Sequence, residues 1–296
     1  MAVAFPPGTA GNQRMVAYRS MRTLIRVDNP PEVTVFFWRS YESDLERVIE
    51  VVLAPGLAAL DVGANCGVVT IAMRAAVGPT GRVLSVDPSP EACRRVHEQA
   101  ELNRIDNIEV IPAALGAEDT IAQYFRGRVG VGTLPALDTG LITREALETK
   151  VTTVDALIRS RRIDRIALMK IDTDGSECSV LEGAHATLRR QRPVVACECY
   201  PEGLRRRGRS PDDQAKLLID AGYSLLRPRF RRSSRLLARP PQLLHFEPLV
   251  DLAELPEEGA LNIVALHQKE PRHQHIFDRL TAGEPGTRAS IRRRPR

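Results

Sequence analysis

The chain has 296 residues, of which 43% are hydrophobic and 27% charged. It is therefore long and apolar enough to bury a core, which excludes a disordered or low-complexity protein. The formal net charge is +5, but seven arginines and only two acidic residues lie between Pro271 and Arg296. The excess positive charge belongs to this tail, so it is weak evidence for a nucleic-acid partner.

No apolar run approaches the roughly 20 residues of a membrane span, and the first residues lack the charged and apolar regions of a secretory signal. The cysteines are odd in number and show no CxxC spacing, which indicates reduced, buried thiols. We therefore expect a soluble, cytoplasmic protein that does not associate with membranes, of undetermined oligomeric state. The cysteines are Cys66, Cys93, Cys178, Cys197 and Cys199.

The first 56 residues predict a lead-in segment that packs on the main domain. They carry an aromatic group, Phe36, Phe37, Trp38 and Tyr41, and then a helical pattern in SDLERVIEVVL. From Leu57 short apolar runs alternate with helical stretches, which is typical of a parallel sheet with crossover helices. The pattern predicts strands at 57–62, 82–87 and 108–115, and helices at 68–77 and 90–103.

Residues 117–150 are less regular, with one strand expected at Ile121–Phe125 and a glycine-rich loop, GRVGVGTL. The pattern after them predicts a short helix, a second strand–helix–strand unit and the rest of the sheet. Beyond about Lys269 we expect a disordered basic tail, so the main domain spans 57–269 and the tail 270–296. The later strands are expected at 166–172, 194–200, 223–226 and 260–267, and the later helices at 176–191 and 211–221.

The segment Asp61-Val-Gly63-Ala-Asn65-Cys-Gly67 lies where the first of these strands passes to its helix. Glycine and Asn65 let the backbone turn sharply beside a ligand. Neither the dinucleotide fingerprint nor a phosphate loop is present. A carboxylate at the mouth of the loop would repel a pyrophosphate but would suit the ammonium and sulfonium groups of S-adenosylmethionine (SAM).

Asp87 ends the second strand of this unit, 20 residues past Gly67. An acid at that place can accept hydrogen bonds from both hydroxyls of a ribose, in SAM or equally in NAD. Asp61 and Asp87 also have a purely structural interpretation, because each precedes a turn that a carboxylate can cap. The ordered set of two acids and two glycines on one sheet edge favours the cofactor site.

A second informative segment, Lys170-Ile-Asp172-Thr-Asp174-Gly-Ser-Glu177, follows the strand IALMK and brings up to three carboxylates to the same edge. With it the chain resembles the FkbM family of SAM-dependent methyltransferases over roughly residues 41–200. The motifs that carry the resemblance are DVGANCG, SVDPSP, LNRIDNIEV, VTTVDAL, KIDTDGSECSVLEGA and RPVVACE.

The resemblance implies a class I methyltransferase (Rossmann-like) fold, with a seven-stranded, mostly parallel sheet flanked by helices, and methylation of hydroxyls on secondary metabolites or sugars. Thr173 and Asp174 stand where the family usually has valine and glutamate, so the charge is kept on a shorter arm. The implied cofactor is SAM, and the implied SAM-binding residues are Asp61, Gly63, Ala64, Asn65, Gly67 and Asp87.

Methyl transfer requires an acceptor oxygen aligned behind the methyl carbon and the loss of its proton. The candidate catalytic residues are Asp172, Asp174, Glu177 and Glu198. Asp174 and Glu177 would equally well cap the helix that follows them, and Lys170 would pair with one of these acids. We expect no metal, because the acids form no evident octahedral set and no HExxH-type pair occurs.

Two other functions stay open. An arginine-rich region, residues 205–239, and the tail would recruit a nucleic-acid methyltransferase, although KIDTDG is not the motif of a DNA amino-methylase and few aromatics interleave the arginines. A catalytically inactive SAM-binding protein is the other, since a fold alone does not imply activity. The favoured acceptor is a small-molecule or sugar hydroxyl.

Overall fold

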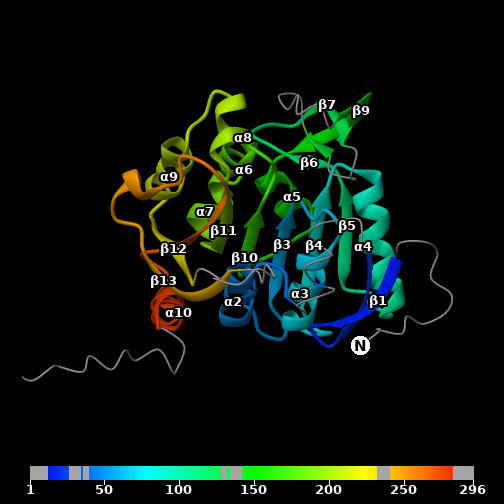
Figure 1. Cartoon of the computed structure of the whole chain (residues 1–296), viewed down its shortest axis with the longest axis horizontal. Coiled ribbons are helices and arrows are strands. Elements are labelled where there is room, and N and C mark those ends of the chain that lie inside the picture. The colour runs from blue at the N-terminus through cyan, green and yellow to red at the C-terminus, as the bar shows by residue number, and fades with distance from the viewer. Residues whose placement is uncertain are drawn as a thin grey trace, which may run out of the picture.

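The computed structural model describes residues 13–26, 35, 40–127, 132–133, 142–231 and 241–282. The largest element of the described structure is an eight-stranded sheet (Figure 1). In order across the sheet its strands are β13 (Gln242–Pro248), β12 (Tyr223–Arg231), β14 (Leu261–His267), β11 (Val194–Cys199), β10 (Leu168–Ile171), β3 (Ala58–Val62), β4 (Arg82–Asp87) and β5 (Ile108–Pro112).

Five neighbouring strands, β5, β4, β3, β10 and β11, are parallel, and β14 is antiparallel to the strands on both of its sides. This is the class I methyltransferase sheet that the sequence predicts, with one antiparallel strand among seven. The eighth strand, β13, extends the sheet beyond the prediction by pairing with β12. Its sequence, QLLHFEP, has one fully buried apolar side chain, Phe246, and too weak an alternation to predict a strand.

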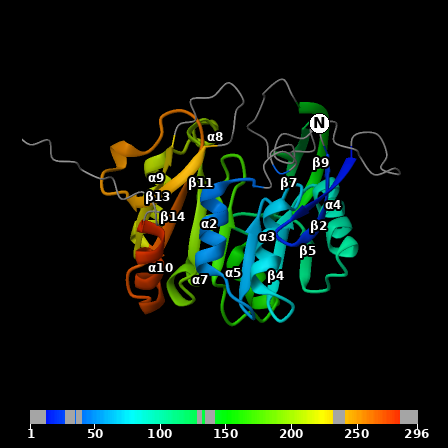
Figure 2. The same ribbon diagram turned by 60° about the horizontal axis from the view of Figure 1, so that its bottom comes forward.

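Helices cover both faces of the large sheet. Leu60 and Val62 of β3 contribute to one apolar core, while Ala59, which precedes them, contributes to the other, so the strand carries apolar side chains on both faces. One face carries α2 (Ser43–Val52), α3 (Val68–Val77), α4 (Pro90–Leu102) and α10 (Pro271–Thr281) (Figure 2). The other carries α5 (Val154–Ser160), α6 (Glu177–Glu182), α7 (His185–Arg190), α8 (Pro201–Arg206) and α9 (Pro211–Asp220).

The prediction that the disordered tail begins at residue 270 is wrong for its first part. Residues 271–281 form α10, which begins with Pro271 and packs on α2 and β13. Leu280 is buried, and Ile276 and Phe277 pack against the core. The many arginines of this segment led to the prediction of disorder, although its apolar side chains form one face of a helix. That face packs on α2, some 230 residues earlier in the chain.

The helix predicted at 176–191 is two helices, because the chain breaks between α6 and α7 at Gly183. A Cβ at that position would overlap the carbonyl oxygen of Gly116, so the helix comes too close to the neighbouring loop to carry a side chain there. The backbone N–H of Asp155 donates to the Gly183 carbonyl oxygen at 3.0 Å. The break therefore joins α6 to the start of α5.

Residues 114–152 contribute a second, smaller sheet rather than the single strand expected there. Its order is β6 (Ala114–Leu115), β9 (Ile142–Thr152), β7 (Thr120–Gly127) and β8 (Gly132–Thr133), and β6, β7 and β9 lie together at one corner of the molecule in Figure 1. In the lead-in region an antiparallel hairpin, β1 (Gln13–Tyr18) and β2 (Met21–Arg26), packs on α4. A short 3₁₀ helix spans Leu252–Glu254.

Three expectations concern residues outside the described ranges: the aromatic residues 36–38, most of the glycine-rich loop after 127, and the tail beyond 282. Within the described ranges, no helix combines the length and the apolar character that crossing a membrane requires.

Candidate active site

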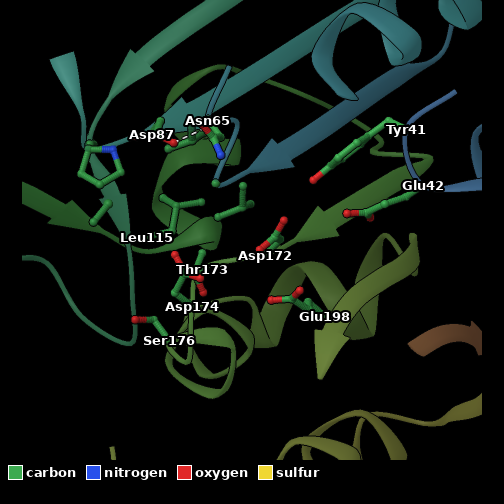
Figure 3. A pocket seen from close by; sticks show the side chains of 16 residues that line it. Tyr41, Glu42, Asn65, Asp87, Leu115, Asp172, Thr173, Asp174, Ser176 and Glu198 are labelled. Carbon is green, nitrogen blue, oxygen red and sulfur yellow. Dashed lines mark hydrogen bonds between the residues drawn. The ribbon is translucent and has the colours of Figure 1, made fainter. Parts of the chain in front are cut away.

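A cavity of about 240 Å³ lies at the carboxyl ends of β3, β4, β10 and β11 (Figure 3). This is the edge at which ligands of open parallel sheets bind. Among the described residues, five with a carboxyl side chain line it and no lysine, arginine or histidine does. Its lining comprises Tyr41, Glu42, Val62, Gly63, Asn65, Val86, Asp87, Pro88, Ala113, Ala114, Leu115, Asp172, Thr173, Asp174, Ser176 and Glu198.

The loop after β3 forms one wall through its backbone. Gly63 has φ +78°, and a Cβ there would overlap the carbonyl oxygen of Asp172, so only glycine allows the loops after β3 and β10 to meet. Asn65 has φ +48° and lines the cavity. Gly67, with φ +81°, begins α3 and packs against Val96 instead. Of the loop residues predicted to bind the cofactor, only Gly63 and Asn65 line the cavity.

Asp87 lines the cavity and at the same time orders its wall. Its Oδ2 accepts a hydrogen bond from the Asn65 backbone N–H at 2.9 Å, and its Oδ1 accepts one from the Ser89 backbone N–H at 2.8 Å. The structural interpretation of this acid describes these two contacts, and each oxygen keeps a lone pair that is available to a ligand hydroxyl. Burial raises the pKa of Asp87 to about 6, against the effect of the two backbone donors.

Asp61 lies behind the wall, which differs from the expectation that it stands at the mouth of the loop. Its side chain is fully buried, its Oδ2 accepts from Thr70 Oγ1 at 2.6 Å, and its Oδ1 lies 3.2 Å from Lys170 Nζ. Ala64 is buried too, and its N–H donates to the Val86 carbonyl oxygen. Neither residue lines the cavity.

Lys170 is the buried cation that joins the two loops. Its Nζ donates to the Gly63 carbonyl oxygen at 2.7 Å and lies 3.4 Å from Asp172 Oδ2, in addition to its pair with Asp61. Although burial opposes it, the carboxylates of Asp61, Asp172 and Glu42 raise the pKa of Lys170 above its usual value. The lysine therefore stays charged and holds the ends of β3 and β10 at fixed separation.

Three of the predicted catalytic acids, Asp172, Asp174 and Glu198, reach the cavity from the ends of β10 and β11 (Figure 3). Burial and the carboxylates of Asp172 and Glu177 raise the pKa of Asp174 to about 7. Burial and the neighbouring carboxylates, Asp172 first among them, raise the pKa of Glu198 well above its usual range. In the described part of the chain, no three His, Cys, Asp or Glu side chains are placed to hold a metal ion.

Glu177, the fourth predicted catalytic acid, is fully buried and does not line the cavity. Its Oε1 accepts from the backbone N–H groups of Thr173 and Gly175, at 2.8 and 3.1 Å, and from Thr173 Oγ1 at 3.0 Å. The alternative interpretation of this residue, a carboxylate that satisfies backbone donors at a helix start, describes its contacts. Asp174 does not take that role, because it lies in the loop with φ +53° and faces the cavity.

The sequence model of the methyltransferase FkbM domain matches residues 61–225, more than half of the chain. This range contains the loops after β3 and β10 and most of the cavity wall. The chain belongs to the FkbM methyltransferase family. The resemblance noted in the sequence is thereby confirmed, and the cofactor of the FkbM domain is SAM.

Comparison with individual proteins adds more distant relatives. The chain is 36% identical over 87 residues to the ribosomal protein L11 methyltransferase of Chloroflexus aurantiacus, a match that covers 29% of this chain and 25% of that protein. An FkbM methyltransferase structure from Methylobacillus flagellatus has 15% identity and a TM-score of 0.44, over 80% of this chain and 48% of the other. A SAM-dependent methyltransferase from Aquifex aeolicus has 17% identity and a TM-score of 0.40, over 81% and 94%. The chain thus spans a quarter to a half of the length of the first two.

The cavity of the FkbM domain fits SAM by the chemistry of its lining. Asp87 presents to the cavity a carboxyl group of the kind that accepts hydrogen bonds from ribose hydroxyls, and Gly63 in the neighbouring wall carries no side chain. The lining residues that the structure describes include no cation to neutralise the pyrophosphate of a dinucleotide, whereas their carboxyl groups suit the sulfonium and ammonium groups of SAM.

Two lining residues lie outside the matched range and were not among the sequence candidates: Tyr41 and Glu42, which precede α2. A third residue, Asn262 of β14, donates from Nδ2 to Glu42 Oε2 at 2.9 Å. No local pattern marks these residues, because their role depends on α2 and β14 meeting at the end of β11. The acidic start of α2, ESDLE, is the one signal that draws attention to them.

Proposed function

We propose that this FkbM domain methylates a hydroxyl group of a small molecule or sugar with SAM as the methyl donor. One observation carries the proposal: a single cavity joins an end shaped for a nucleoside, around Asn65 and Asp87, to an end of polar groups that can hold a hydroxyl, around Asp172 and Glu198. Both ends are needed for transfer between two bound molecules.

When bound, SAM supplies an electrophilic methyl group. Asp87 holds the ribose hydroxyls, and the loop at Gly63 and Asn65 sets the distance between the cofactor and the end of β10. Asp172, held by Lys170 at 3.4 Å, stays in place beside the acceptor. The raised pKa of Glu198 favours its protonated form, and a protonated carboxyl can donate a hydrogen bond to an acceptor oxygen.

The charge of the cavity disfavours a nucleic-acid acceptor. A phosphate backbone would enter a space whose described lining carries five carboxyl groups and no cation, so the electrostatic attraction that dominates nucleic-acid binding is lacking there. A neutral or cationic hydroxyl compound meets no such barrier.

Calorimetric titration of the purified protein with SAM, with NAD⁺ as control, tests the cofactor site. Micromolar SAM binding without NAD⁺ binding is expected, and the reverse would contradict the assignment. Transfer of a labelled methyl group from SAM to methyl glycosides and to catechol then tests the hydroxyl acceptor. Tight SAM binding without transfer to any of them would favour an inactive SAM-binding protein. Transfer to lysine-containing peptides or to RNA, and not to these compounds, would contradict the proposal of a small hydroxyl compound as acceptor.

A further inference from the structure

The end of the cavity beyond Asp172 includes residues that lie outside the range of the family match. Tyr41 and Glu42 precede α2, and Asn262 lies on β14, so they come from before residue 61 and after residue 225. Figure 3 shows the side chains of Tyr41 and Glu42 pointing toward Asp172 from the side opposite Asp87. Segments outside the matched range, the residues before α2 and strand β14, therefore complete the part of the cavity that faces away from the loop after β3.

Asn262 holds Glu42 in a defined orientation. Its Nδ2 donates to Glu42 Oε2 at 2.9 Å and to Asp44 Oδ2 at 3.0 Å, which uses both of its amide hydrogens. In the sheet register Asn262 lies directly opposite Glu198 of β11. Asp44 is buried in the first turn of α2. One side chain thus ties the start of α2 to the strand end that carries Glu198.

The groups around Glu42 oppose its ionisation on balance. Burial and the carboxylates of Asp172 and Asp44 raise the pKa of Glu42 to about 7, while Asn262 and Lys170 act in the other direction. The two other neighbours are Tyr41 and Glu198. Burial and the carboxylates of Glu42 and Asp172 keep the pKa of Tyr41 above its usual value, and burial and the neighbouring carboxylates raise the pKa of Glu198. Glu42 is thus a carboxylate that both takes and releases a proton near neutrality, as a general base must.

We propose that Glu42 is the general base that takes the proton from the acceptor hydroxyl, and that Asn262 is the residue that positions it. This inference rests on the proposed function. The acceptor oxygen forms a bond to the methyl carbon as the carbon–sulfur bond breaks with its electron pair going to sulfur. The hydroxyl proton passes to Glu42, and the products are a methyl ether, S-adenosylhomocysteine and protonated Glu42, which releases its proton to solvent.

The first test compares Glu42→Gln with wild type in transfer of labelled methyl groups to methyl glycosides and catechol. We expect kcat to fall about 100- to 10,000-fold, the range of general-base catalysis, with SAM affinity within about twofold by calorimetry. Glu258→Gln is the matched control, since Glu258 is exposed and distant from the cavity lining, and its kcat should equal that of wild type. Unchanged kcat in Glu42→Gln would overturn the inference and leave the proposed function standing. If wild-type protein binds SAM but methylates no probe, the proposed function fails first.

The second test uses Asn262→Ala and does not depend on turnover. In protein labelled with ¹³C at glutamate carboxyl carbons, the signal absent from Glu42→Gln identifies Glu42, and its titration should have a midpoint near 7. Asn262→Ala removes a donor to the charged form, so this midpoint should move upward, and the acid limb of kcat/KM should move with it. A structural role alone would lower the yield of folded protein without moving either midpoint. A Glu42 midpoint near that of exposed glutamates would contradict the inference.

Discussion

The two ends of the cavity are built in different ways. The end proposed for the cofactor is shaped mainly by the backbone. Gly63 and Asn65 adopt left-handed conformations, and Asp87 accepts hydrogen bonds from two backbone N–H groups. At the acceptor end side chains from four separate segments meet: Glu42, Asp172, Glu198 and Asn262. The first end lies within one strand–loop–helix–strand unit, and the second exists only when α2, β10, β11 and β14 have assembled.

The comparison shows where variation is tolerated. A site formed by the backbone is disrupted by an added atom, as at Gly63, but changes little when other side chains are replaced. Its shape therefore suits one cofactor. A side-chain-built site can change with each contributing segment, while the sheet beneath it stays the same. Lys170 connects the two ends, because it bonds to Gly63 on one side and pairs with Asp172 on the other.

The largest effect is expected for Gly63→Ala. The added Cβ would overlap the Asp172 carbonyl oxygen, so the loops after β3 and β10 must separate. We expect SAM affinity to fall more than about 100-fold and the free energy of unfolding to fall by about 3 kcal/mol or more, measured by calorimetry and by urea denaturation. Gly208→Ala is the control: Gly208 has φ +67° but nothing within 4 Å, so it should lose only about 1 kcal/mol and keep SAM affinity. Equal losses in both variants would mean that the close approach is unimportant.

Asp87→Ala comes next. It removes the carboxylate that we expect to hold the ribose, and charge-assisted hydrogen bonds of about 1.5–3 kcal/mol correspond to a loss of roughly 10- to 150-fold in SAM affinity. Asp251→Ala is matched to it, because Asp251 also accepts from a backbone N–H two residues later but lies on the surface. Calorimetry of both variants should show a change only for Asp87→Ala. Unchanged affinity there would place the ribose elsewhere.

Asp172→Asn separates the two ends, because Asp172 lies between them. We expect SAM affinity to stay within about threefold and kcat to fall about tenfold, the equivalent of one hydrogen bond of about 1.4 kcal/mol. Steady-state kinetics with varied acceptor, alongside calorimetry with SAM, gives both quantities. A loss confined to SAM affinity would assign Asp172 to the cofactor end.

The smallest effect concerns stability against pH at the acceptor end. Three cavity carboxyls have pKa values raised in the folded state, to about 7 for Glu42 and Asp174 and well above the usual range for Glu198. Between the unfolded and folded pKa values the folded state binds more protons, so the free energy of unfolding falls as pH rises. Each such carboxyl contributes at most about 1.4 kcal/mol per pH unit.

Urea denaturation between pH 6 and pH 9 measures this slope. Glu198→Gln removes one of the three carboxyls whose pKa is raised, so the free energy of unfolding of this variant should fall less steeply with rising pH than that of wild type, by at most about 1.4 kcal/mol per pH unit. The exposed-site variant Glu258→Gln should follow wild type. Parallel curves for Glu198→Gln and wild type would show that Glu198 titrates normally.

Much of the cofactor end was predictable from the sequence. Strands and helices from Ala58 to Leu102 match their apolar patterns closely, and Gly63, Asn65 and Asp87 were identified from spacing within a single unit. The placement of Asp61 was not, because a strand-end position does not tell whether the side chain points to the cavity or to Lys170 and Thr70 behind it. The same limit applies to Glu177, whose backbone contacts arise from the turn at Thr173–Gly175.

The sequence by itself determined the alternation of strands and helices, the parallel sheet, and the glycine–acid loop at its edge, because each is a short-range pattern of apolar period, turn residues and charge. The tertiary structure alone decided that α10 packs on α2, that β13 extends the sheet, and that Glu42 and Asn262 meet across 220 residues of chain. Such contacts depend on which apolar surfaces of helices and strands pack together in the folded chain. A local sequence pattern shows that a surface is apolar but does not show which other segment it packs against.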